Sequence, residues 1–167
     1  MLSGEEAMYL LGENSVYAAT GDFERLFRLL KGHPKDKDLG AKIRTRTREA
    51  LTYIWSGGVA STFTFYLAKG GEDNVRTFKT VFEGEEGLPK HLDLEEVAYA
   101  AILYLALKRL KQLGFIKSDL EDPRRCLREL IEIDFFEHMY ALDLLTSYLL
   151  ELKKLCEATF REGCEMT

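Results

Sequence analysis

The sequence is poor in features that mark several large classes of protein. Its three cysteines, Cys126, Cys156 and Cys164, have no C-x-x-C spacing, which indicates neither a disulfide framework nor a zinc knuckle and predicts idle, buried thiols. The longest nearly uncharged run, residues 98–107, has about half the length of a membrane span. We therefore expect no disulfides, no structural zinc and no membrane-spanning helix.

Signals for export are also missing from the first residues. The stretch M-L-S-G-E-E-A contains two acids and lacks the basic start and long apolar run of a secretory signal, which favours a cytoplasmic protein. Asparagine and glutamine are scarce, with Asn14, Asn74 and Gln112 the only three, whereas 31 % of the residues are charged. This bias is typical of heat-adapted proteins, so we expect a thermophilic source.

Familiar catalytic and cofactor-binding motifs are absent too. There is no G-x-S-x-G elbow, no G-x-x-x-x-G-K-[ST] loop and no G-x-G-x-x-G turn. The three histidines, His33, His91 and His138, stand alone in sequence and form no metal-binding pair. Paired acids are too common on this chain to single out a general acid or base. We predict a protein that is not an enzyme and that uses no cofactor or metal.

What the sequence does contain is a helical pattern nearly throughout. A chain of 167 residues, 46 % of them hydrophobic, is sufficient for one domain with a buried core. We expect an all-α fold in which residues 1–167 form a single compact bundle of about five to seven helices. The predicted helices occupy residues 39–56, 59–69, 93–113, 122–133 and 134–161, and residues 4–19 and 22–31 form one further helix or a pair of helices.

Helix starts are marked by acids at capping positions. Asp22 and Asp38 are candidate N-caps, and Asp93 with Glu96 and Asp134 with Glu137 have the spacing of capping boxes. Residues 70–92 are rich in glycine and acids, so we predict a long loop there with one short helix or strand inside it.

Positive charge is concentrated in one place, although the net charge is -5. Residues 42–48, K-I-R-T-R-T-R, hold Lys42, Arg44, Arg46 and Arg48 and no acid. On a helix, Lys42 and Arg46 lie on one flank of an apolar stripe. Arg44 and Arg48 lie on the other flank, whereas on a strand all four would face one side.

Such a cluster suits a phosphate backbone, because lysine and arginine replace the counterions that phosphates condense. The alternative without a nucleic-acid role is a solvated basic surface. Acids elsewhere in the chain, such as those in residues 83–86, would neutralise it. Five aromatic residues follow the cluster and could stack on bases, but most of them are expected in the core. They are Tyr53, Trp55, Phe63, Phe65 and Tyr66.

The stretch R-T-R-E-A-L-T-Y-I-W-S-G-G-V-A-S-T-F-T-F-Y-L-A-K-G resembles the small helical subunit of the type III-B (Cmr) CRISPR RNA-guided effector complex. In that family a basic helix, an apolar position, a tight turn, an aromatic pair and a Lys-Gly ending follow one another. Here Ile54 is at the apolar position and Gly58 is the glycine of the turn. Phe65-Tyr66 is the aromatic pair, and Lys69-Gly70 is the ending. The sequence departs from the pattern at Gly57, where asparagine is usual, at Val59, where leucine is usual, and at Leu51, where proline is frequent.

The resemblance implies a non-catalytic subunit of an antiviral ribonucleoprotein. Its expected partners are the other subunits of the effector complex, especially the repeating backbone subunit, and the duplex of guide RNA and target RNA. It makes Lys42, Arg44, Arg46, Arg48 and Lys69 candidates for contacts with RNA phosphates. Two alternatives stay open: a helical protein–protein adaptor or homodimer without nucleic-acid binding, and a small subunit of another CRISPR complex.

Overall fold

Seven α-helices and no β-strand make up residues 3–161, the part of the chain described by the structure, which is a computed structural model; the side chains of residues 5–13 are outside that description. The helices are α1 (Gly4–Lys31), α2 (Asp36–Gly57), α3 (Val59–Gly70), α4 (Glu72–Glu83), α5 (Leu94–Gln112), α6 (Pro123–Glu132) and α7 (Phe135–Thr159). The predicted all-α bundle is confirmed.

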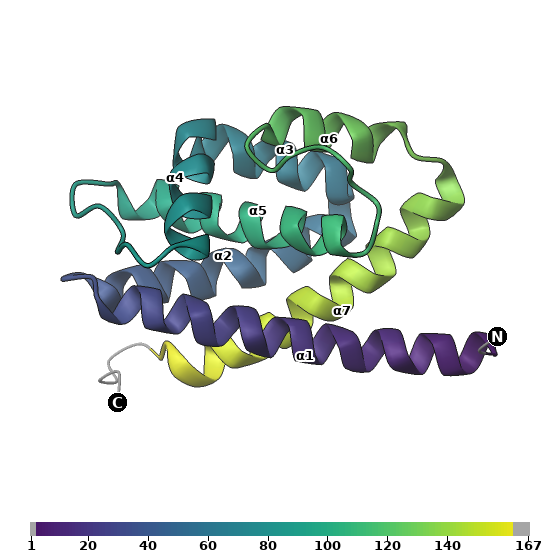
Figure 1. The fold of residues 1–167 in the computed structure, drawn as a ribbon, viewed down its shortest axis with the longest axis horizontal. Coiled ribbons are helices and arrows are strands. Elements are labelled where there is room, and N and C mark those ends of the chain that lie inside the picture. Colours follow the sequence, from purple (N-terminus) through teal and green to yellow (C-terminus); the bar gives the residue numbers. More distant parts are fainter. Residues whose placement is uncertain (1–2, 162–167) are drawn as a thin grey trace.

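Helix α5 forms the centre of the bundle. Every residue from Val97 to Leu107 is buried, because this stretch is apolar on all sides and can be stable in water only when other helices surround it. Helices α2, α3, α4 and α7 all pack against it. Figure 1 shows α3 and α6 on one side of α5 and α1 on the other.

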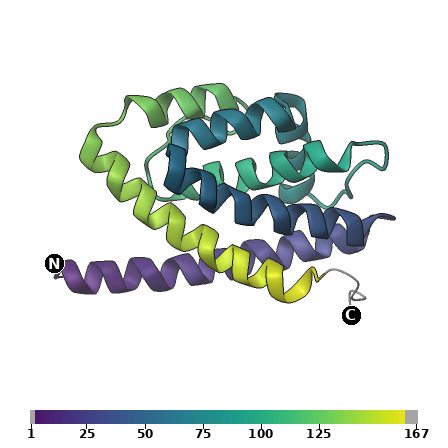
Figure 2. The same cartoon turned by 180° about the vertical axis from the view of Figure 1, so that it is seen from behind.

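The two longest helices, α1 and α7, pack against each other, and α2 also contacts α7. The view from behind in Figure 2 shows α2 and α7 side by side. The first turns of α1 extend away from the other helices in both views. Together these three helices close the side of the core that lies opposite α3 and α6.

Three of the expected helix starts are confirmed by side-chain caps. The Asp93 carboxylate accepts hydrogen bonds from the amides of Glu95 and Glu96, and Asp134 accepts one from the amide of Glu137. Asp122 caps α6 in the same way, with Pro123 following it. The expected cap at Asp38 is wrong: α2 already begins at Asp36, so Asp38 lies within its first turn.

Two further regions differ from the sequence expectation in detail. Helix α1 runs without a break through residues 20–22, so of the two alternatives for residues 4–31 the single helix is the observed one, and Asp22 is not an N-cap. The short helix or strand expected within residues 70–92 is a helix, α4, but it is longer than predicted: it spans Glu72–Glu83, so the loop is limited to residues 84–92. In α4 the apolar side chains Val75, Phe78, Val81 and Phe82 are buried, and this burial outweighs the glycines and acids around them.

Candidate nucleic-acid interface

Helices α2 and α3 form the hairpin that carries the predicted RNA-binding residues. Gly58 joins them with φ 86°, a left-handed backbone conformation that glycine adopts without steric cost. The apolar stripe predicted on α2 is buried: Ile43, Thr47, Ala50, Leu51 and Ile54 all face the core. The helical alternative for the basic stretch is therefore the observed one, and its four cations divide between two flanks.

The first flank faces α5 and is neutralised there. Lys42 Nζ lies 2.8 Å from one carboxylate oxygen of Glu95, and Arg46 Nη2 lies 2.6 Å from the other. Glu95 belongs to the first turn of α5, so a single carboxylate bridges two cations of α2. These two positive charges hold helices together within the protein, and the acid that pairs with them is not in the 83–86 segment.

Arg46 is the more deeply engaged of the two. Its side chain is 18 % exposed, it also pairs with Glu49, and its Nη1 donates to the Tyr99 hydroxyl at 2.8 Å. Its guanidinium lies over the Tyr99 ring, 4.6 Å from the ring centre, a favourable cation–π arrangement. Burial raises the pKa of Tyr99, which keeps the phenol neutral. Arg46 is therefore a neutralised and largely buried cation, although it was a candidate for contact with an RNA phosphate.

The second flank, which we call the outer flank of α2, consists of Arg44, Arg48 and Trp55. Arg48 is one helical turn beyond Arg44, and Trp55 is two turns beyond Arg48, so all three share one face. Arg44 is half-buried, Arg48 is exposed, and Trp55 is 69 % exposed. A guanidinium and a flat aromatic ring are thus available to solvent on the same side of the helix.

Lys69, the fifth predicted residue, lies apart from this flank. It is exposed in the last turn of α3, with its Nζ 5.7 Å from the centre of the Phe65 ring. It also lines a groove of ≈ 860 Å³ between α3, the start of α4 and α6. The charged lining residues are Lys69, Arg124, Arg128, Glu72, Asp73 and Glu96.

Sequence reasoning missed Arg124 and Arg128 on α6, although their i, i+4 spacing places them on one face. Arg124 Nε is 2.5 Å from a carboxylate oxygen of Glu72, and the lining as a whole holds as many acids as cations. The groove therefore has no formal excess of positive charge to attract a polyanion.

The aromatic residues of the hairpin divide in the same way. Phe63 and Tyr66 are buried as expected, and burial raises the pKa of Tyr66, whose neutral hydroxyl donates to the Arg46 carbonyl. Tyr53 and Phe65 are partly exposed and meet edge to face at 5.9 Å. Trp55 is the clear exception to the expectation of core positions, because most of its surface is open to solvent.

The remaining titratable residues form no metal centre in the part of the chain that is described: among residues 3–161, no group of three or more His, Cys, Asp and Glu side chains could hold an ion. Cys126 and Cys156 are free and buried, as predicted for these two, and burial raises their pKa values to about 11 and about 12. Cys164 is outside the described residues.

No helix within residues 3–161 combines the length and hydropathy that a bilayer crossing requires.

The two flanks of α2 should respond differently to charge reversal. Replacing Arg46 with glutamate brings three carboxylates together at α5 and should lower the free energy of unfolding by about 2 kcal/mol, measured by urea denaturation. The matched variant Arg48→Glu has the same change in charge on the exposed flank and should unfold almost as the unchanged protein does. Equal losses in both variants would contradict the division described here.

The hairpin therefore presents one neutralised flank that fixes α2 to α5 and one flank on which Arg48 and the Trp55 indole reach solvent. An exposed guanidinium can bind a phosphate, and an exposed indole can stack on a base; neither group needs a metal or a cofactor to do so. The sequence matches no protein-family model, and no curated protein is similar to it at a significant level.

Proposed function

We propose that this chain is a non-catalytic, cytoplasmic subunit of a type III-B CRISPR RNA-guided antiviral complex, in which it packs along the repeating backbone subunits and contacts RNA phosphates. Two features support the proposal: the resemblance of residues 46–70 to the small helical subunit, and the helix–glycine–helix hairpin formed by those residues. The observation that carries it is the outer flank of α2, where Arg48 and Trp55 are exposed on the same face.

The contact surface proposed here is narrower than the one expected from sequence. Lys42 and Arg46 are paired with Glu95, and the candidates for phosphate contact proposed here are the exposed Arg48, on the outer flank of α2, and Lys69. A helix with cations at these spacings meets the sugar–phosphate backbone and does not read base edges, so binding should be independent of sequence. Stacking on Trp55 adds affinity for unpaired bases without adding specificity.

Reversal of Arg48 and Lys69 to glutamate should remove most of the RNA affinity of the isolated protein. The slope of log affinity against log salt should fall by about two, about one for each phosphate that the variant no longer neutralises. Fluorescence anisotropy with a labelled single-stranded RNA and with an RNA duplex measures both quantities. Because Trp55 is the only tryptophan in the chain, quenching of its emission by the RNA reports stacking directly.

The matched control is the pair Lys37→Glu and Lys90→Glu, which changes the net charge by the same amount at exposed positions far from Trp55 in sequence. This control should keep the affinity of the unchanged protein, apart from a small non-specific loss. Equal weakening in both double variants would show that net charge alone governs binding and would contradict the proposed surface.

A second candidate function is a helical protein–protein adaptor without nucleic-acid binding. The observation in its favour is the group of large apolar side chains exposed where α6 meets α7. An adaptor should show no anisotropy change with either RNA at low salt and no quenching of Trp55. Retention of RNA that depends on Arg48 and Lys69 would exclude this candidate.

A further inference from the structure

The corner between α6 and α7 exposes an unusual amount of apolar surface. Five large apolar side chains are exposed within ten consecutive residues, and we call this group the α6–α7 corner. Its members are Ile131 (62 % exposed), Phe135 (71 %), Phe136 (82 %), Met139 (47 %) and Tyr140 (46 %). Single exposed apolar residues are ordinary on a protein surface, but a contiguous group of this kind is typical of an interaction site.

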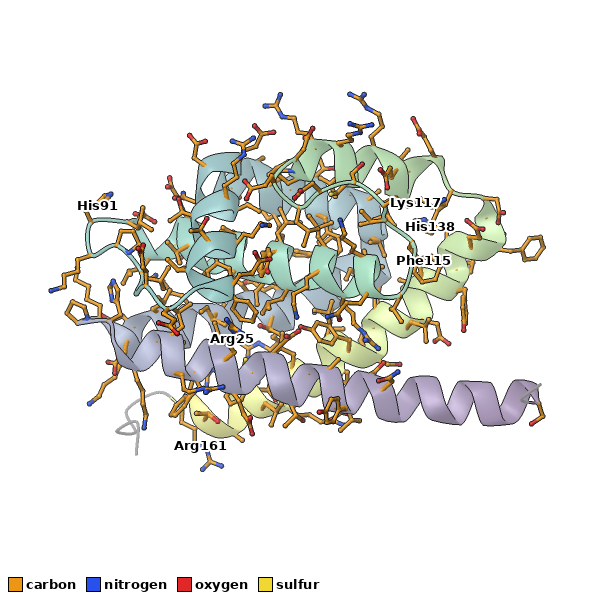
Figure 3. All side chains as sticks on the ribbon, viewed as in Figure 1. Arg25, His91, Phe115, Lys117, His138 and Arg161 are labelled. Atoms are coloured by element: carbon orange, nitrogen blue, oxygen red, sulfur yellow. The ribbon has the colours of Figure 1, made fainter. Side chains whose placement is uncertain are left out.

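The four members of the corner on α7 are continuous because of helix geometry, whereas Ile131 belongs to α6 and lines the groove beside α3. Phe135 and Met139 are one turn apart on α7, as are Phe136 and Tyr140, so the four side chains cover the outward face of its first two turns. The rings of Phe135 and Phe136 lie 5.8 Å apart, and the ring of Tyr140 meets that of Phe115 edge to face at 5.9 Å. Figure 3 shows Phe115 and His138 in this region of the molecule.

These side chains are not needed for the protein's own core. Helix α7 packs on the rest of the bundle through its other face, where residues such as Ala141, Leu145 and Leu149 are buried. Phe135 and Met139 precede these buried residues at helical spacing, but both face solvent. An uncovered apolar face of this size costs solubility, and its presence is explained if a partner covers it.

The charge around the corner restricts what that partner can be. Residues 129–152 contain six carboxylates and no lysine or arginine. Glu132, Asp134 and Glu137 are exposed and alternate in sequence with the apolar residues of the corner. The nearest cation before this stretch is Arg128, one turn from Ile131, at the groove beside α3. Within residues 129–152 the corner is therefore an apolar patch whose charged neighbours are all acids, its acidic border, and the cation shown nearby is Lys117 of the loop before α6 (Figure 3).

A second copy of the chain fits this surface poorly. In a two-fold dimer the same patch contacts itself, so the three border carboxylates of one copy would face those of the other. Like charges brought together at an interface oppose association, whereas opposite charges favour it and select the partner. A basic partner satisfies both the apolar centre and the acidic border.

We infer that the α6–α7 corner docks an amphipathic protein segment whose apolar side chains are flanked by lysine or arginine. The aromatic side chains supply the apolar contact area, and Glu132, Asp134 and Glu137 pair with the flanking cations. This inference concerns a protein partner and does not depend on RNA contact by α2, which lies at other residues.

The probe that tests it is a labelled synthetic helical peptide with leucine on one face and lysine on the other, titrated against the full chain. The unchanged protein should bind it, and the double variant Phe135→Ser, Phe136→Ser should bind it about tenfold more weakly or worse, as expected when interface anchors are truncated. Tyr17→Ser is the matched control, because Tyr17 on α1 is 81 % exposed, almost as much as Phe136. It should leave the affinity unchanged.

Charge is tested with a second peptide in which glutamate replaces every lysine. The unchanged protein should reject it, whereas the variant Glu132→Lys, Glu137→Lys should bind it and should lose the lysine peptide. Reversal of the exposed Glu85 and Glu86, in the loop before α5, is the control with the same change of net charge. Circular dichroism on every variant establishes that the fold is kept.

Two results would overturn the inference. One is equal binding of both peptides by the unchanged protein, because the acidic border would then have no role. The other is a concentration-dependent dimer in sedimentation velocity that Phe135→Ser, Phe136→Ser converts to monomer, because a second copy would then be the occupant of the corner.

Discussion

Replacement of Asp22 with alanine should lower the free energy of unfolding by about 3 kcal/mol, the low end of the range for breaking a buried ion pair. The Asp22 carboxylate accepts a hydrogen bond from Lys108 Nζ at 2.6 Å and another from the Tyr148 hydroxyl at 2.7 Å. It thereby joins α1 to both α5 and α7. Alanine would leave a buried phenol and a mostly buried ammonium without these partners.

The surroundings of Asp22 increase the cost. Arg109 is 4 % exposed, its Nη2 lies 3.3 Å from Ser15 Oγ, and its guanidinium lies 5.9 Å from the centre of the Tyr148 ring. Burial lowers the pKa of Arg109, and the nearby carboxylate of Asp22 opposes that shift. Removing Asp22 would thus take the negative charge away from two cations. The Lys108 side chain is 24 % exposed and can turn toward water, which keeps the expected loss at the low end.

Guanidinium denaturation followed by circular dichroism measures this loss, and three companion variants identify its origin. Tyr148→Phe removes one hydrogen bond and should cost about 1 kcal/mol. Asp22→Asn keeps the shape and should fall between the other two. The double variant Asp22→Ala, Lys108→Met should recover part of the loss, since no unpaired ammonium remains. A double variant less stable than Asp22→Ala alone would contradict the assigned role of Lys108.

The role of Asp22 could not be predicted from the sequence around it. Its position after Gly21 and before an apolar helical stripe is that of an N-cap, and the local sequence contains nothing that argues against that role. The residues that instead hold it inside a continuous α1 belong to α5 and α7. Contacts between residues so distant in sequence are not encoded in any local pattern, so the local sequence left open both a single helix and a pair capped at Asp22.

The features that were predicted correctly depend on near neighbours. The caps at Asp93 and Asp134 bond amides within three residues, and the buried stripe of α2 follows from helical spacing alone. Helix α4 was predicted only as a short helix or strand: Val75, Phe78 and Phe82 recur at helical spacing, but the glycines and acids around them favour a loop.

The candidate RNA-binding residues were identified as a group, and their individual environments were not. That Lys42 and Arg46 lie on a different flank from Arg44 and Arg48 follows from helical geometry. Which flank would be neutralised depends on the placement of Glu95, which the packing of α2 against α5 determines. Exposure of Trp55 likewise depends on which helices cover α2, and composition cannot reveal that.

Replacement of Gly70 with alanine should have the second large effect, a loss of about 2 kcal/mol in the free energy of unfolding. An added Cβ would lie 2.8 Å from the backbone nitrogen of Ala100 and 3.1 Å from its Cα. Both are main-chain atoms of α5, whose side chains are buried on all sides around that point, so α5 cannot move away without disturbing the core. The clash therefore outweighs the higher helix propensity of alanine.

Two other helical glycines provide matched controls for the same substitution. Gly21 in α1 has no atom within 4 Å of an added Cβ, so Gly21→Ala should raise the free energy of unfolding by about 0.5–1 kcal/mol through helix propensity alone. At Gly40 the added Cβ would meet the Phe160 ring at 2.6 Å. That ring is buried against Phe23, so Gly40→Ala should also lower the free energy of unfolding, in contrast to Gly21→Ala.

The melting temperatures of these three variants, compared with one another, test whether α3 approaches α5 as closely as described. That approach gives a physical reason for the glycine in the Lys69-Gly70 ending of the hairpin, because any side chain at residue 70 would push α3 off α5 and shift Lys69 with it. Gly70→Ala should therefore melt below the unchanged protein and Gly21→Ala above it. If Gly70→Ala melts as high as Gly21→Ala, the two helices are farther apart than described, and the glycine of the hairpin has no role in packing.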